Sequence, residues 1–258
     1  MSTVTTTPAG RMAALARAEL TLLGRSRTAV LSAVFLPLAM PLSLRSAVEQ
    51  MDLKNVGLSV GLVLLPASIG FSLLFSVYAT LVGVFTARRE ELVLKRLRAG
   101  ELHDAEILAG AAFPAAVIGL VQSLVLAVGC TALLDVPAPK APQLAVLGLV
   151  SGLALCACLA AVTAGFTRTV ESAQVTSLPL ILASMTVSGV VVPLELLPGR
   201  LATVCELLPL TGVITLVRGG WTGDLSMYET VAPVLTTLAW TAVGVFAVRR
   251  WFQWEPRR

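Results

Sequence analysis

Residues 57–86 read "GLSVGLVLLPASIGFSLLFSVYATLVGVFT" and contain no charged side chain. About 20 apolar residues suffice for a helix to cross a bilayer, so this stretch is longer than one crossing needs. The chain as a whole is also apolar, with a mean hydropathy of +0.86. Only 13% of its residues are charged, against roughly a quarter in soluble domains. These values predict an all-α, polytopic membrane protein.

Six apolar blocks qualify as membrane-spanning helices, and they lie at 28–44, 57–86, 107–134, 144–166, 175–193 and 231–248. A weaker apolar region within 194–228 is interrupted by prolines and charges, which argues against a simple span. Before the first block, residues 9–26 predict a helix lying at the membrane interface, with a frayed polar tail as the alternative. We therefore treat 1–258 as a single transmembrane domain.

The distribution of basic residues predicts the orientation. Arginine and lysine are concentrated before the first block, between the second and third, and after the last. Because cytoplasmic loops carry the excess of positive charge, both termini are expected in the cytoplasm, with six spans crossing the cell membrane.

The spans hold almost no ionisable residues, which disfavours an ion-coupled transporter and a membrane-embedded enzyme. His103 is the only histidine, so a multi-histidine metal centre is excluded, and the four cysteines imply no disulfide framework. Low aromatic content argues against nucleic-acid binding. Nothing matches the G-x-x-x-x-G-K-[ST] pattern of a P-loop, so the chain carries no ATP site of its own.

A dense charged block follows the second span, where residues 86–108 read "TARREELVLKRLRAGELHDAEIL". Spaced leucines give it an apolar ridge, so within the cytoplasmic region 88–103 we predict an extension of the second span followed by a short amphipathic helix suited to a groove on a soluble partner. Gly100 is expected to end that helix, and Asp104, with Glu106 in the same turn, to cap the next one. The alternative is a solvated basic loop that only fixes topology and touches lipid headgroups.

The fourth span carries a small residue at every fourth position, namely Gly148, Gly152, Cys156, Ala160 and Ala164. Such a stripe lets another helix approach closely. We expect a helix-packing seam, within one subunit in preference to between two.

Two stretches resemble ABC transporter type-2 permeases. "RREELVLKRLRAGELHDAEILAG" (88–110) is similar to the family's cytoplasmic loop, although Glu101 and His103 depart from its usual residues. "PLELLPGRLATVCELLPLTGVITLVR" (193–218) is similar to its late proline-rich segment, which forms re-entrant helices on the outer face. The residues that fit this second motif are Pro198, Leu208, Pro209, Leu210, Thr211 and Arg218.

The resemblance implies a permease subunit, most simply in a homodimer, served by two copies of a separate cytoplasmic subunit that binds ATP and Mg. The charged block would then be the coupling helix that docks on that subunit. Its docking residues would be Arg88, Arg89, Glu90, Glu91, Leu94, Lys95, Arg96, Leu97 and Arg98, with the two leucines as apolar anchors.

Spans without fixed charge suit an apolar or amphiphilic cargo, such as a drug, an antibiotic or a lipid-like molecule, and favour efflux. Such an exporter would contribute to antibiotic resistance. Polysaccharide or lipid export by the same family, or a scaffold or sensor subunit that moves no cargo, remain alternatives. The chain itself is predicted to be no enzyme and to bind no cofactor or metal.

Overall fold

The computed structural model describes residues 39, 43–50, 53, 59–99, 103–134, 136–191, 194 and 198–255. The predicted interfacial helix at 9–26 and nearly all of the first predicted span, 28–44, lie outside these ranges. Throughout the described ranges the chain forms helices and connecting turns, with no strand. This confirms the predicted all-α, polytopic class.

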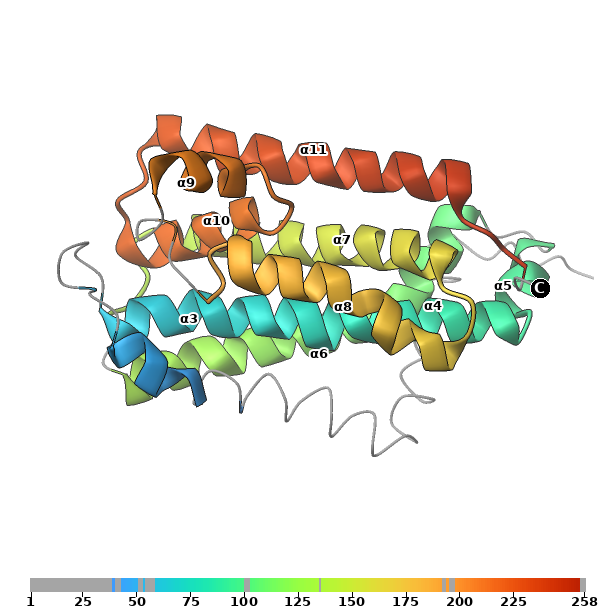
Figure 1. The fold of residues 1–258 in the computed structure, drawn as a ribbon, viewed down its shortest axis with the longest axis horizontal. Coiled ribbons are helices and arrows are strands. Elements are labelled where there is room, and N and C mark those ends of the chain that lie inside the picture. The colour runs from blue at the N-terminus through green and yellow to red at the C-terminus, as the bar shows by residue number, and fades with distance from the viewer. Residues whose placement is uncertain are drawn as a thin grey trace, which may run out of the picture.

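Five long apolar helices follow the long axis of the molecule (Figure 1). The first is a continuous helix from Val60 to Glu90, made of α3 (Val60–Phe71), the π-helical segment η2 (Ser72–Ala79) and α4 (Thr80–Glu90). The other four are α6 (Asp104–Leu133), α7 (Pro142–Phe166), α8 (Val170–Val187) and α11 (Met227–Trp251). Each overlaps one of the predicted spans, since apolar length alone marks a crossing helix.

The Val60–Glu90 helix lies at the centre of the bundle. In its most apolar window 83% of the residues are buried, against 17–44% in the other four long helices. Leu73, Leu74, Val77 and Tyr78 are fully enclosed. A helix that is apolar on all sides is expected in the interior, and this one contacts α6, α7, α8 and α10.

Buried hydroxyls on the central helix bind α6. Ser72 Oγ donates to Gln122 Oε1 at 3.4 Å, and the Ser76 hydroxyl donates to the same oxygen. Nearer the charged end, Tyr78 Oη and Thr163 Oγ1 lie 2.9 Å apart, which links the helix to α7. Buried polar groups are costly unless they are hydrogen-bonded, so these pairs fix how the central helix sits against its neighbours.

The helix α8 begins and ends earlier than the predicted span 175–193. It starts after Thr169, whose side chain accepts a hydrogen bond from the amide of Ser172 at 3.3 Å and so caps the helix. It ends at Val187, ahead of Gly189, whose φ of 70° is incompatible with continuing the helix. Local capping therefore sets these ends, and hydropathy does not.

The two ends of the bundle differ (Figure 1). One end carries the short helix α5 (Val93–Arg98), the α7–α8 junction and the C-terminal residues. The opposite end carries α9 (Gly199–Glu206) and α10 (Thr211–Thr222), which meet at 102°. The break falls where the sequence is interrupted by Glu206 and Pro209.

Candidate functional site

The charged block forms the cap at one end of the bundle. The helix α4 ends at Glu90, and α5 begins at Val93 after a tight turn. Leu92 makes this turn with a φ of 59°, and among the described residues it is the only non-glycine residue with positive φ. The left-handed conformation costs a branched side chain free energy, so the turn is held by the contacts on either side of it.

The helix α5 presents cations outward and one leucine inward. Its exposed side chains are Lys95, Arg96 and Arg98, and Leu97 is partly buried. Leu94 is 1% exposed, because α5 packs against α4 and α6. The prediction that Leu94 anchors a partner is therefore wrong for the subunit described, since this side chain is already covered by its own chain.

Arg89 does not belong to the exposed surface. Its side chain is fully buried, with Nη1 donating to the carbonyl of Ala164 at 2.7 Å and Nη2 donating to the carbonyls of Thr167 and Arg168. The last carbonyls of a helix have no partner within the helix and carry the negative end of its dipole. The C-terminus of α7 therefore draws this guanidinium inward, which corrects its predicted place among the docking residues.

Of the neighbouring charges, Glu90 and Glu91 are exposed and Arg88 is partly buried. Glu90 Oε1 accepts a hydrogen bond from the amide of Val170, at the start of α8, at 3.2 Å. Arg88 Nη1 lies 3.0 Å from Glu91 Oε2 in a pair three residues apart on one helical turn. Arg88, Glu90 and Glu91 are thus placed at the same end as the exposed cations of α5.

The turn into α6 differs from the prediction that Asp104 caps the helix. His103 occupies the cap position, and the Glu106 carboxylate accepts from its amide at 2.8 Å, as in a capping box. Asp104 is the first helical residue and lies 3.0 Å from Arg98 Nε. Because Glu106, at the third helical position, reaches back to the amide of His103, Asp104 is not needed for capping and pairs with Arg98 instead. Gly100 lies outside the described residues.

A contact missed by sequence reasoning joins the C-terminal residues to α5. Lys95 Nζ lies 2.7 Å from Glu255 Oε1, and the Arg98 guanidinium lies 4.8 Å from the centre of the Trp254 ring. Phe252 packs edge-on against Trp254. The signal in the sequence is "WFQWE" (251–255), in which three aromatic residues and one acidic residue follow the last span and complement a cationic helix.

The predicted re-entrant motif is brought together at the opposite end of the bundle. Thr211 Oγ1 donates to the carbonyl of Cys205 at 2.6 Å, across the break between α9 and α10. Arg218 is buried and donates to the carbonyl of Gly189 at 3.2 Å. Leu210 is fully buried, Pro209 is partly buried and Pro198 is exposed just before α9. Trp240 Nε1 of α11 donates to the carbonyl of Leu207 at 2.8 Å.

The stripe of small residues on α7 packs inside the subunit. Gly148, Gly152, Cys156, Ala160 and Ala164 are all buried. A Cβ added at Gly148 would lie 3.0 Å from Leu216 Cβ of α10, and one at Gly152 would lie 2.8 Å from Val213 Cγ1. The seam is therefore the place where α10 comes close to α7, as the reading within one subunit predicts.

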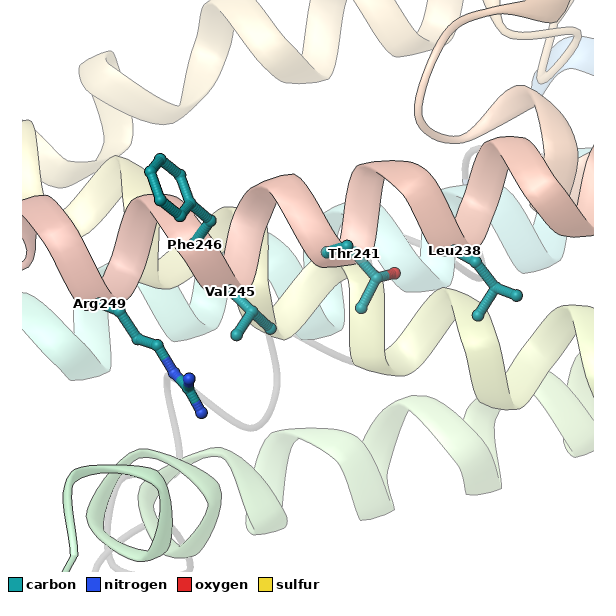
Figure 2. Close-up of a pocket in the computed structure, with 6 residues that line it drawn as sticks. Leu238, Thr241, Val245, Phe246 and Arg249 are labelled. Carbon is teal, nitrogen blue, oxygen red and sulfur yellow. The ribbon is translucent and has the colours of Figure 1, made fainter.

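An open hollow of about 480 Å³ lies along α11. It is lined by Leu238, Thr241, Ala242, Val245, Phe246 and Arg249. Figure 2 shows Leu238, Val245 and Arg249 projecting from the same side of α11. Apolar walls that end at one guanidinium suit an amphiphile or an acyl chain. Across the described ranges no three His, Cys, Asp or Glu side chains gather as metal ligands.

A family model described as ABC-2 type transporter matches residues 11–222. This range takes in the charged cap, the α7 seam and the α9–α10 pair, and it stops at the last residue of α10. No curated protein matches the chain.

Proposed function

The chain belongs to the ABC-2 type transporter family as a multi-pass membrane permease subunit that pairs with an ATP-binding subunit, and we propose that it exports an apolar or amphiphilic compound. Hydrolysis of ATP, with Mg, takes place on that separate subunit. The charged cap faces the cytoplasm together with both termini, and α9 and α10 lie at the outer face.

The observation that carries this proposal is the cap itself. A cationic helix stands at the end of the most enclosed span and is joined to it by a turn of two residues, Glu91 and Leu92. Its exposed cations are Lys95, Arg96 and Arg98. Such a helix suits a groove on a soluble subunit, and its short connection supports a transfer of movement into the bundle.

The docking surface is narrower than the sequence alone predicts. With Arg89 and Leu94 turned inward, it consists of Arg88, Glu90, Glu91, Lys95, Arg96, Leu97 and Arg98. Two permease subunits, each with one ATP-binding subunit, complete the transporter. Closure of the ATP-binding pair carries both α5 helices with it and shifts the spans between inward-facing and outward-facing states.

The cargo follows from the chemistry of the spans. Among the described residues, the middle of the bundle offers hydroxyl and amide groups such as Ser72, Ser76 and Gln122, and no carboxylate. The hollow on α11 is apolar over most of its length. Both features support a drug, antibiotic or lipid-like cargo taken from the inner leaflet, which would make antibiotic efflux its physiological role.

Charge reversal on α5 tests the docking. The chain is co-expressed with a P-loop ATPase encoded in a neighbouring reading frame, and Lys95→Glu/Arg96→Glu is compared with Lys140→Glu/Arg200→Glu. All four side chains are exposed, and the second pair lies at the opposite end of the bundle. We expect the α5 variant to lose at least about tenfold in co-purified ATPase, since several opposed charges separate the partners. Equal recovery of ATPase by both variants would refute the docking site.

Transport is tested in inverted membrane vesicles that contain the purified pair. We expect ATP-dependent uptake of the amphiphilic dye Hoechst 33342, which corresponds to export in the cell, and its loss in the α5 variant. Translocation of fluorescently labelled phosphatidylethanolamine without dye uptake would favour lipid export instead. ATP hydrolysis with neither dye uptake nor lipid translocation would contradict apolar export.

A further inference from the structure

Two consecutive residues at the end of α4 contact two different helices. Arg89 donates to the carbonyls of Ala164, Thr167 and Arg168, where α7 ends. Glu90 accepts from the amide of Val170, where α8 begins. Residues 89 and 90 thus bind both sides of the three-residue junction 167–169 between α7 and α8.

The two charges match the two helix ends. A helix carries partial negative charge at its C-terminus and partial positive charge at its N-terminus. The cation of Arg89 meets the C-terminus of α7, and the anion of Glu90 meets the N-terminus of α8. Hydrogen bonds in which one partner is ionised are stronger than neutral ones, and those of Arg89 are buried, so Arg89 holds the junction more firmly than surface ion pairs do. The bond of Glu90, at 3.2 Å, is exposed and adds the contact with α8.

Burial strengthens the contact between Arg89 and the end of α7. Arg89 is fully buried, so water does not compete for its carbonyl partners. Arginine suits this place because its planar fork reaches several oxygens at once, whereas a lysine ammonium is a compact point charge on a flexible stem. Only residues 91 and 92 separate this pair from α5.

We propose that Arg89 and Glu90 are positioning residues that form a clamp, through which a displacement of α5 moves the α7–α8 junction. This inference rests on the proposed docking of the ATP-binding subunit at α5. A push on α5 reaches α4 through the two-residue turn and then α7 and α8 through the clamp. Since α7 packs along α10, the movement continues to the outer end of the bundle.

Distances between spin labels test the clamp in the complete transporter in lipid nanodiscs, with the four native cysteines replaced by alanine. Labels are placed at Ala99→Cys after α5, Gln174→Cys on α8, and Leu133→Cys at the far end of α6 as the reference. All three positions are exposed. Between the nucleotide-free and the ATP-vanadate states, we expect the first two labels to shift relative to the reference while their mutual distance stays constant.

Two variants break the clamp in different ways. Glu90→Ala removes an exposed side chain, so the fold is expected to survive, and Arg89→Lys keeps the buried charge but loses the fork. In both we expect the shift at Ala99→Cys to persist and the shift at Gln174→Cys to fall by at least half. The matched control is Glu229→Ala, which removes a helix-capping carboxylate at the opposite end of the bundle. It is expected to keep both shifts.

The outcomes separate the clamp from the docking it depends on. If the label at Gln174→Cys shifts as much in both variants as in the chain with an intact clamp, the clamp is refuted while docking stands. If the label after α5 does not shift with nucleotide even in the unmodified chain, docking at α5 is refuted, and with it the transmission. In the permease alone, Glu90→Ala should broaden the distances between Ala99→Cys and Gln174→Cys, and an unchanged width would contradict the clamp without involving the partner.

Discussion

Gly220 offers the sharpest test of how α10 is held against α7. A Cβ built on Gly220 would lie 2.6 Å from the backbone nitrogen of Ala145 and 2.7 Å from its Cβ. Ordinary contacts begin at 3.4 Å, so Gly220→Ala requires α10 to withdraw by about 0.8 Å at this point. The obstacle is backbone, which cannot rotate away as the end of a side chain can. Overpacking of this kind costs about 1–3 kcal/mol.

The matched control is Gly129→Ala on α6, where an added Cβ meets nothing within 4 Å. Both substitutions replace glycine by alanine inside a helix, so the gain in helix propensity, about 1 kcal/mol, cancels in the comparison. The difference between the two variants then reports overpacking alone. At roughly 2–4 °C per kcal/mol, Gly220→Ala should melt roughly 2–12 °C below Gly129→Ala.

The assay follows the buried cysteines. Cys130, Cys156 and Cys205 are buried, so a thiol-reactive fluorophore reports unfolding of the detergent-solubilised permease. Adding Ala145→Gly to Gly220→Ala removes the 2.7 Å contact but leaves the 2.6 Å contact with the backbone, so recovery should be partial. A melting temperature for Gly220→Ala at or above that of Gly129→Ala would refute the close approach of α10 to α7.

Three further predictions use the same melting assay. Leu94→Ala, at a buried leucine, should lower the free energy of unfolding by about 2–5 kcal/mol. Leu207→Ala, at an exposed leucine, should change it by less than about 0.5 kcal/mol. Equal effects of the two variants would contradict the inward orientation of Leu94. Leu92→Gly should raise stability by about 1 kcal/mol, because glycine adopts the φ of 59° without strain, and a loss would contradict the turn. Ser226→Ala removes the hydroxyl that accepts from the amide of Glu229 and should cost about 0.5–2 kcal/mol; no change would show that the cap of α11 contributes nothing.

The positions of the described spans could be predicted because apolar length is a property of the sequence itself. Stretches such as 57–86 and 144–166 nearly coincide with helices of the structure. The ends could not be predicted to the residue, as α8 shows, because a cap such as Thr169 or a glycine with positive φ is set by local hydrogen bonds. The interruption before α10 was visible in its prolines and charges, although its 102° angle was not.

A short helix after the second span could be predicted from the sequence, but not which side chains of the charged block face outward. A charge run indicates an exposed face, yet Arg89 turns inward because the carbonyls at the C-terminus of α7 lie beside it, about 75 residues further along the chain. The left-handed turn at Leu92 also interrupts the helical period between α4 and α5. A single helical projection across 86–98 therefore groups residues that face different ways, and it places Leu94 on the outside.

Enclosure of the Val60–Glu90 helix has a consequence for how the bilayer acts on this protein. Within the described subunit, acyl chains meet α6, α8 and α11, whose apolar side chains point outward, and barely reach the helix that leads to α5. A change in bilayer thickness alters the tilt of lipid-facing helices through hydrophobic mismatch. Membrane composition should therefore act first on the lipid-facing helices α6, α8 and α11. It should affect the Val60–Glu90 helix only through the helices that surround it.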